Sequence, residues 1–265
     1  MNVRLQRGNA PLLVSIPHLG TLIPEPMRDA YVPRALQVED ADWHLDRLYA
    51  FVHELGASVL QPTVARYVVD LNRPPDDTPM YPGASNTELC PTRFFTGEPL
   101  YRDGAAPSAS ERIERRERYW APYHDALQGE LDRLRAEHGF ALLWDAHSIR
   151  SEIPWLFEGV LPDLNIGTAD GASAAPCITE AVASAAARAP GVSHVVNGRF
   201  KGGYITRRYG RPDDHVHAVQ LEMVQKLYMR EAPPYDYDQA RAAAIQPVLR
   251  DMVASALAAC RKLYG

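Results

Sequence analysis

The chain has 265 residues, and 28 lysines and arginines against 33 acidic residues give it a formal net charge of −5. Such a mildly acidic chain has no general attraction for phosphate backbones or anionic lipid, so nucleic acid and membrane surfaces are poor candidate partners. We find no apolar run of the roughly 18 residues that a membrane span needs. A hydrophobic content of 46% is typical of a globular protein, and three well-separated cysteines fit the reducing cytoplasm and exclude a disulfide scaffold or a cysteine zinc site.

In the first half of the chain, short apolar runs alternate with a helical pattern. Leu12–Ile16 predicts a buried strand, and apolar residues at helical spacing from about Ala41 to Leu55 predict a helix ending at Gly56. Two more strands are expected, at Ser58–Leu60 and Tyr67–Leu71. A long stretch rich in proline, glycine, aspartate and threonine follows, and it predicts a surface loop over Pro74–Pro107.

The second half begins with a capping-box pattern. Ser108 and Glu111 have capping-box spacing, and they predict the start of a charged helix that runs to about His138 and is kinked or divided by Pro122. The later elements are expected to be a strand at Phe140–Trp144, a helix at Ile178–Ala189, a strand at Val216–Met223 and a helix at Gln239–Leu263. This alternation indicates a single α/β domain over residues 1–265, built on a largely parallel or mixed sheet.

Several common catalytic signatures do not occur in the sequence. There is no GxxxxGK[ST], no GxGxxG after a strand, no HExxH and no GxSxG. Phosphate-loop, dinucleotide and serine-hydrolase functions are therefore poorly supported.

Two histidines follow predicted strands, where open α/β sheets place their sites. His18 comes just after the first strand, between Pro17 and Gly20, and His147 comes just after the strand at Phe140–Trp144. Alternation puts Asp145 on the same side of the chain as His147, so it is a candidate to orient that ring. Each histidine is either a metal ligand or a structural side chain bonded within the loop.

An acidic cluster at Glu39-Asp40-Ala41-Asp42 offers a carboxylate. These acids are either simple helix N-terminal charges or the third member of a two-histidine, one-carboxylate site that leaves zinc an open position. His44 is a competing ligand in the same segment.

Cationic side chains gather in two segments. Arg66 precedes the apolar stretch at Tyr67–Leu71, and Asn72 and Arg73 follow it; arginine suits bidentate carboxylate recognition, whereas Asp70 is expected to pair with an arginine. Residues 197–210 contain four cations, two tyrosines and four glycines, which suggests a wall that binds an anion. RNA binding by this segment is disfavoured by the net charge. The candidate substrate-binding residues within residues 197–210 are Arg199, Tyr204, Arg207 and Arg208.

Glu222 lies within the apolar strand Val216–Met223. Burial raises the pKa of a carboxyl group toward the range useful for a general base, although a buried Glu–Arg pair is the alternative. With the histidines and arginines, this glutamate completes the parts of a metal-assisted hydrolase that acts on an anionic substrate.

The chain resembles the N-formylglutamate amidohydrolase family over nearly its whole length. The resemblance rests on motifs that follow one another in the same order: Val14–Gly20, Asp40–His44, Arg66–Arg73, Asp145–Ser151, Asn197–Gly210 and His217–Glu222. It implies an α/β fold with a central mixed, mostly parallel sheet flanked by helices, similar to that of the zinc carboxypeptidases and aspartoacylases. It also implies cleavage of N-formyl-L-glutamate to formate and L-glutamate in histidine degradation.

The resemblance implies roles for particular residues. One Zn²⁺ would be held by His18, a carboxylate and His147, Arg66 would polarise the scissile carbonyl, and Glu222 would activate water. The substrate carboxylate would bind Asn72 and Arg73, with a second anchor among Arg199, Arg207 and Arg208. The wider group takes two ligands from His-x-x-Glu, but Leu19-Gly20-Thr21 follows His18 here, so the carboxylate must come from elsewhere. Asp42 is favoured, then Asp40 and then Glu25.

Two other functions stay open. The same zinc site serves equally for another N-acyl amino acid, and a non-catalytic anion-binding protein would use the arginines alone, with structural histidines. The sequence gives no indication of oligomeric state.

Overall fold

The structure is a computed structural model that describes residues 2–80 and 87–265. Its centre is a seven-stranded sheet with the order β1-β3-β2-β4-β7-β5-β6. The strands are β1 (Val3–Gln6), β2 (Leu12–Ser15), β3 (Ser58–Pro62), β4 (Ala141–Ile149), β5 (Leu164–Gly167), β6 (His194–Val196) and β7 (Val216–Val224). Only the β1–β3 and β5–β7 pairs are antiparallel, so the sheet is mixed and mostly parallel, as predicted.

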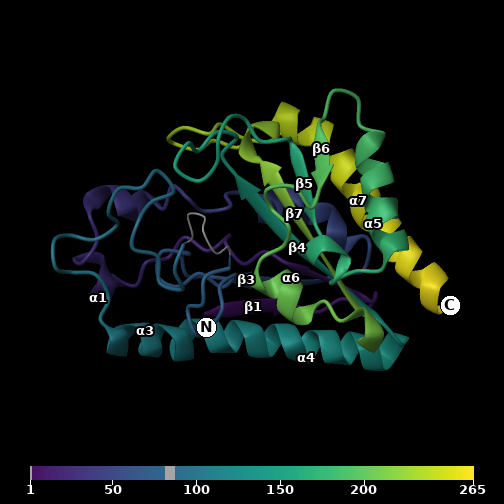
Figure 1. Cartoon of the computed structure of the whole chain (residues 1–265), viewed down its shortest axis with the longest axis horizontal. Coiled ribbons are helices and arrows are strands. Elements are labelled where there is room, and N and C mark those ends of the chain that lie inside the picture. Colours follow the sequence, from purple (N-terminus) through teal and green to yellow (C-terminus); the bar gives the residue numbers. More distant parts are fainter. Residues whose placement is uncertain (1, 81–86) are drawn as a thin grey trace.

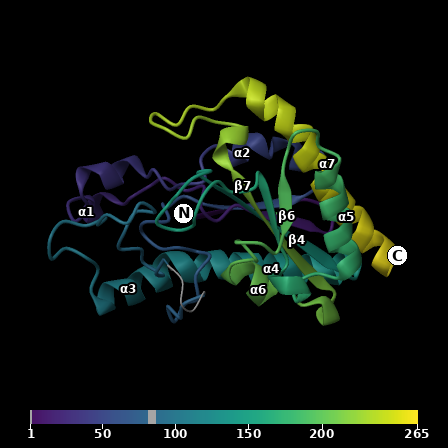
Figure 2. The same ribbon diagram turned by 45° about the horizontal axis from the view of Figure 1, so that its top comes forward.

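Helices cover both faces of this sheet. The α-helices are α1 (Glu25–Arg28), α2 (Leu45–Leu48), α3 (Ala109–Arg115), α4 (Ala121–His138), α5 (Pro176–Ala187), α6 (Tyr204–Tyr209) and α7 (Gln239–Tyr264). Short helical turns lie at η1 (Pro33–Gln37), η2 (Ala50–His53), η3 (Arg116–Trp120), η4 (Ala169–Gly171), η5 (Pro212–Asp214) and η6 (Gln225–Leu227). Helices α4 and α6 lie on one face, and α5 and α7 lie side by side on the other (Figures 1 and 2).

The alternation of side chains along β4 builds both layers of the core. Leu142 and Trp144 are fully buried in the layer under α5 and α7, whereas Leu143 packs in the layer under α4. Burial on both faces explains why β4 and β7 are continuously apolar apart from a few polar side chains. Those polar side chains are the exception that marks a site.

The long charged helix is divided, as predicted. Ser108 caps it: its hydroxyl accepts the Glu111 N–H, and the Glu111 carboxylate accepts the Ser108 N–H. The π turn η3 then separates α3 from α4, and Pro122 lies in the first turn of α4. Proline has no N–H to donate to the carbonyl of Arg118, and the side-chain amide of Asn2 donates to that carbonyl instead.

Two predictions for the first half of the chain differ from the structure: one strand is wrong and one helix is wrong in part. Tyr67–Leu71 is not a strand: Val68 N–H bonds back to the Ala65 carbonyl and Arg73 N–H to the Asp70 carbonyl, so the segment turns. The helix expected from about Ala41 to Leu55 begins only at Leu45, because His44 has the left-handed φ of 62°, and it is not continuous: α2 ends at Leu48 and the 3-10 turn η2 follows at Ala50–His53. Gly56 ends this region with φ of 72°, as predicted.

The stretch at Pro74–Pro107 is irregular over its described residues, in which Tyr101 and the Arg93–Pro99 pair form isolated bridges. The part of the predicted loop at residues 81–86 lies outside the described residues. The later predictions for helices and strands are confirmed by α5, β7 and α7, and β4 extends beyond Trp144 to Ile149.

Helix α7 is long and apolar enough, by length and composition alone, to cross a membrane, whereas the sequence pattern predicts no apolar run of that length. Of its most apolar 18-residue window, 39% is buried in the protein, where α7 packs against α5. One such helix is weak evidence for a membrane span, because core helices pass the same test.

Candidate metal centre and its pocket

The predicted site residues meet at the carboxyl ends of three neighbouring strands. His18 follows β2, while His147 and Glu222 lie near the ends of β4 and β7. Parallel pairing brings these ends to one edge of the sheet. Asp42 reaches the same place because its backbone N–H donates to the carbonyl of His18.

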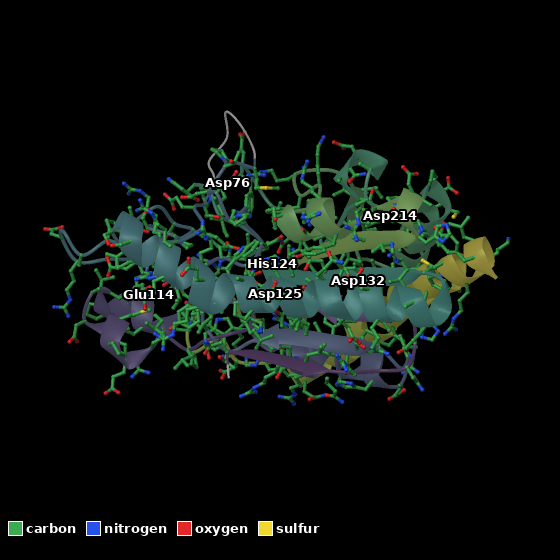
Figure 3. All side chains as sticks on the ribbon, turned by 90° about the horizontal axis from the view of Figure 1, so that it is seen from below. Asp76, Glu114, His124, Asp125, Asp132 and Asp214 are labelled. Atoms are coloured by element: carbon green, nitrogen blue, oxygen red, sulfur yellow. The ribbon has the colours of Figure 1, made fainter. Side chains whose placement is uncertain are left out.

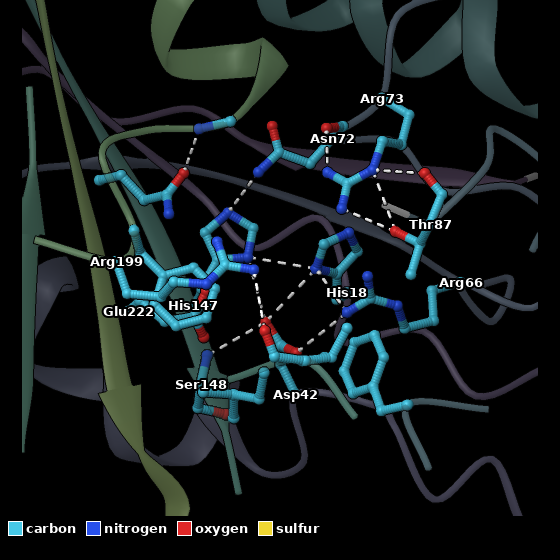
Figure 4. Close-up of a pocket in the computed structure, with 16 residues that line it drawn as sticks. His18, Asp42, Arg66, Asn72, Arg73, Thr87, His147, Ser148, Arg199 and Glu222 are labelled. Carbon is cyan, nitrogen blue, oxygen red and sulfur yellow. Dashed lines mark hydrogen bonds and ion pairs between the residues drawn. The ribbon is translucent and has the colours of Figure 1, made fainter. Parts of the chain in front are cut away.

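Three buried side chains converge there (Figure 4). The Nδ1 atoms of His18 and His147 are 3.2 Å apart, and Asp42 Oδ2 lies 3.6 Å and 3.2 Å from them respectively. One ligand atom from each residue lies within 4.8 Å of the others. Two imidazole nitrogens and a carboxylate oxygen form a donor set that suits Zn²⁺ with an open coordination position.

The far nitrogens of both rings face carboxylates. His18 Nε2 lies 2.7 Å from Asp70 Oδ1, and His147 Nε2 lies 3.1 Å from Asp145 Oδ2. When a cation binds beside Asp42, these carboxylates accept the Nε2 proton of each ring in a hydrogen bond and leave each Nδ1 lone pair for the cation. Alternation along β4 accounts for the second pair, as expected from the sequence.

Charge within the cluster is tightly balanced. Burial alone would raise the pKa of Asp42, but hydrogen bonds from His147 and His18 hold it below its ordinary value. Burial would lower the pKa of His147, and the carboxylates of Asp145 and Asp42 raise it well above the ordinary value instead. The pocket therefore stabilises positive charge beside Asp42. A divalent cation fits these residues, and binding it requires the loss of that proton.

Glu222 faces His147 across the β4–β7 pair in direct register. Its side chain is buried, and burial raises its pKa to about 8, although the positive charge of His147 acts in the opposite direction. A carboxyl group with this pKa takes up and releases protons near neutrality.

Arg66 is held against the cluster from the other side. Its Nη2 donates to Asp70 at 2.6 Å, which is the arginine–aspartate pair that the sequence suggests, and its Nη1 lies 4.0 Å from Asp42 Oδ1. The guanidinium also lies 4.5 Å from the centre of the Phe95 ring. Burial alone would lower the pKa of Arg66, but the carboxylates of Asp70 and Asp42 raise it above its ordinary value, so the guanidinium stays positively charged in the pocket.

Asn72 and Arg73 line the wall next to His147. The Asn72 side-chain amide lies 3.1 Å from His147 Nε2, and its oxygen accepts the Ile205 N–H. The Arg73 guanidinium donates to Thr87 Oγ1 at 2.7 Å and to the Asn72 carbonyl at 2.9 Å. These bonds fix the direction in which the guanidinium presents its remaining donors.

The glycine- and arginine-rich segment supplies the opposite wall. Among the residues that the structure describes, the pocket lining includes Arg199, Phe200 and Gly203 but does not include Tyr204, Arg207 or Arg208. A Cβ at Gly203 would lie 2.3 Å from Asn72 Nδ2, so only glycine permits this approach.

The three residues outside the lining make contacts of their own. The Tyr204 ring lies 5.5 Å from His124, Arg207 Nε donates to the Gly202 carbonyl, and Arg208 lies over the Tyr209 ring. Their predicted contact with substrate is not tested by these positions, and it stays a prediction.

The other candidate ligands lie elsewhere. Asp40 bonds to the Tyr67 hydroxyl and to Arg150, Glu25 is exposed on α1, and His44 Nε2 bonds to the Tyr235 carbonyl. Glu39 pairs with Arg34. Of the carboxylates considered from sequence, Asp42 is the one that meets both histidines.

Sequence reasoning missed several residues of the pocket, and three of them make specific contacts. Thr87 fixes Arg73, Phe95 underlies Arg66, and Gln220 accepts the Gly203 N–H at 2.7 Å. Gln220 had a usable signal, because it lies two residues before Glu222 on the same face of β7. Thr87 and Phe95 come from the irregular stretch at Pro74–Pro107, where no periodicity exists to assign a face.

Comparisons of the sequence and of the fold with known proteins find matches that cover most or nearly all of this chain. A sequence profile of the family described as N-formylglutamate amidohydrolase matches residues 10–229. An N-formylglutamate deformylase of Pseudomonas putida is 51% identical over 95% of this chain and 94% of its own, and one of Pseudomonas aeruginosa is 52% identical over 98% and 97%. The solved N-formylglutamate amidohydrolase of Ralstonia eutropha JMP134 superposes with a TM-score of 0.81 at 25% identity, covering 98% of this chain and 97% of that one.

Proposed function

This chain belongs to the N-formylglutamate amidohydrolase family, and we propose that it hydrolyses N-formyl-L-glutamate to formate and L-glutamate. The names of its Pseudomonas relatives support this activity, and the pocket offers the charges that a dicarboxylate needs. The reaction would serve histidine degradation in the cytoplasm, and residues 1–265 would form one amidohydrolase domain.

His18, Asp42 and His147 would hold one Zn²⁺. When bound, the ion lowers the pKa of a water molecule toward neutrality and polarises a carbonyl oxygen. Asp70 and Asp145 hold the two imidazoles with Nδ1 directed inward, so these carboxylates belong to the same arrangement.

Glu222 would act as the general base. It would take a proton from the water that attacks the formyl carbon, and it would return that proton to the nitrogen as the C–N bond breaks and glutamate leaves. Its place opposite His147 and its pKa of about 8, raised by burial, support both transfers.

Arg66 would stabilise the negative charge that develops on the formyl oxygen. Its guanidinium is already fixed by Asp70 and Phe95, so little reorganisation is needed when charge appears. The neutral amide gains this charge only on the way to the transition state, so the interaction favours catalysis over ground-state binding.

The two carboxylates of the substrate need at least two cationic partners. Asn72 and Arg73 would bind one of them, and Arg199 is the preferred partner for the other because it lines the pocket. Tyr204, Arg207 and Arg208 stay candidates for a supporting part in this recognition.

The convergence of His18, Asp42 and His147 at a pocket that also contains Glu222 and three arginines carries the proposal. The test is formate release from N-formyl-L-glutamate by zinc-loaded, chelated and zinc-restored protein. We expect activity that disappears with the chelator and returns with Zn²⁺. If zinc binds without formate release, other N-acyl amino acids become the substrate class; if neither occurs, an anion-binding protein is favoured.

A further inference from the structure

A stacked pair of rings, one at the end of η3 and one on α4, is not used by the proposed chemistry. Trp120 is the last residue of the π turn η3. His124 follows four residues later, near the middle of the long helical stretch formed by α3, η3 and α4 (Figure 3). Their ring centres are 3.7 Å apart with an angle of 26° between the planes. Spacing of four residues places both on one face of the helix.

Both rings donate to backbone carbonyls on either side of Asn72. Trp120 Nε1 donates to the Arg73 carbonyl at 3.0 Å, and His124 Nε2 donates to the Leu71 carbonyl at 2.9 Å. The Tyr209 hydroxyl donates to His124 Nδ1 at 2.9 Å, which completes the hydrogen bonding of the imidazole. Burial lowers the pKa of His124 to about 3, so the ring stays neutral with its single proton on Nε2.

The segment at Leu71–Arg73 depends on such donors. Residues 71–73 lie in a turn and a bend outside the described sheet, so no neighbouring strand pairs with the carbonyls of Leu71 and Arg73. Leu71 is 1% exposed and Arg73 is half-buried, and a carbonyl taken out of water without a donor is costly. The two ring N–H groups supply the hydrogen-bond donors that a neighbouring strand supplies to carbonyls within a sheet.

The same segment lines the pocket through its side chains. Asn72 contacts His147, and Arg73 is fixed by Thr87 and by the Asn72 carbonyl. A shift of the Leu71–Arg73 backbone would therefore move the amide and the guanidinium together, relative to the cluster of His18, Asp42 and His147.

We propose that Trp120 and His124 form a positioning pair that holds Asn72 and Arg73 at the orientation needed to bind a substrate carboxylate. The pair touches no reacting atom and acts only through the backbone of Leu71–Arg73. This inference rests on the proposed function for its kinetic consequence, although the structural restraint exists independently of the substrate.

Trp120→Phe tests the donor while it keeps an aromatic ring on His124. We expect KM for N-formyl-L-glutamate to rise about five-fold, in line with the loss of one buried hydrogen bond, while kcat changes less than about two-fold. The zinc content should stay at the wild-type value. Amide hydrogen exchange in peptides that contain residues 70–75 should become faster. The matched control is Trp144→Phe, which removes another buried indole donor, to Tyr49 Oη, in the opposite core layer.

His124→Phe and His124→Gln give an independent test. The phenylalanine variant keeps a ring but loses the donor to Leu71, so it should raise KM and speed the exchange, as Trp120→Phe does. The glutamine variant keeps a side-chain N–H, so it should recover much of the wild-type KM.

The inference is overturned if Trp120→Phe and His124→Phe leave both KM and exchange at residues 70–75 unchanged. It is also overturned if the two variants lower kcat, zinc content and stability to the same extent as the control Trp144→Phe, because equal losses would indicate a structural role only. If the wild-type protein releases no formate, the proposed function fails, and the exchange rates alone then decide whether the pair restrains this segment.

Discussion

Asp70 Oδ1 lies 2.7 Å from His18 Nε2, on the side of the imidazole away from Asp42. The same carboxylate also accepts a hydrogen bond from Arg66 and one from the Asn72 N–H. One buried aspartate therefore fixes a candidate metal ligand, a candidate catalytic arginine and the start of the substrate-binding segment. Its pKa is held well below the ordinary value by Arg66 and His18, despite the opposing effect of burial, so it is ionised.

Asp70→Asn should weaken zinc binding by about 10- to 100-fold, because the amide no longer fixes the His18 tautomer with a full charge. The measurement is the zinc dissociation constant by competition with a chromophoric chelator. Asp76→Asn, which changes an exposed aspartate six residues away, is the control and should bind zinc normally. Equal zinc affinities in all three proteins would remove this role from Asp70.

Glu222→Gln should lower kcat by at least about 100-fold, because the amide accepts no proton from the attacking water. Zinc content and KM should stay near the wild-type values, since Glu222 is not among the three predicted ligands. Formate release and bound zinc are measured on the same preparations. Glu114→Gln, at an exposed glutamate of α3, serves as the control. A kcat close to the wild-type value would assign the proton transfer to another group.

Arg73→Ala and Arg199→Ala should each raise KM by about 10-fold or more with a smaller effect on kcat, because each removes a charge-assisted bond to a carboxylate. Arg73→Lys should recover little, since an ammonium group does not reproduce the fork that Thr87 orients. Steady-state kinetics with N-formyl-L-glutamate give both constants. Arg188→Ala, at an exposed arginine of the α5–α7 face, is the control. Should either variant retain the wild-type KM, that arginine does not bind substrate.

His217 makes the stability of the fold depend on pH. It is fully buried on β7; its Nδ1 accepts the Ala175 N–H and its Nε2 lies 2.6 Å from the Tyr264 hydroxyl. Burial lowers its pKa from 6.5 to about 4, so folding favours the neutral ring. The stability that follows is present above pH 6.5 and is lost as the pH falls from 6.5 through about 4.

Urea unfolding of the wild-type protein and of His217→Gln, at about pH 7.5 and about pH 4.5, measures this contribution. On going from the higher to the lower pH, the free energy of unfolding should fall further in the wild type than in His217→Gln, by an additional amount on the order of 2 kcal/mol. His53→Gln, at an exposed histidine, should behave as the wild type does. Parallel losses in wild type and His217→Gln would contradict the assignment.

Local sequence patterns were sufficient for much of the framework. The period-two alternation in β4 and β7 put Asp145 and His147 on one face and marked Glu222 as a carboxylate in an apolar strand. The capping box at Ser108 and the proline at position 122 predicted where the long helix begins and divides. These features depend on neighbours within a few residues, so the sequence carries them directly.

The position of Tyr67–Leu71 depended on the rest of the fold. Its β-branched residues suit a strand, but β3 occupies the position beside β2 and β1 lies beyond β3. The rings of Trp120 and His124 bond the carbonyls of Arg73 and Leu71 instead. An apolar pattern indicates that side chains are buried, but it does not indicate which backbone groups will form hydrogen bonds with one another.

The sequence by itself determined which strand ends carry histidines, a buried glutamate and arginines, because these follow from the order of short segments. The tertiary structure alone decided that Asp42, rather than Asp40 or Glu25, meets His18 and His147, and that Arg199, rather than Arg207 or Arg208, lines the pocket. The backbone bond from Asp42 to His18 and the left-handed turn at His44 produce the first result. Both results depend on distances of a few ångströms between distant segments, and these arise only when the chain packs.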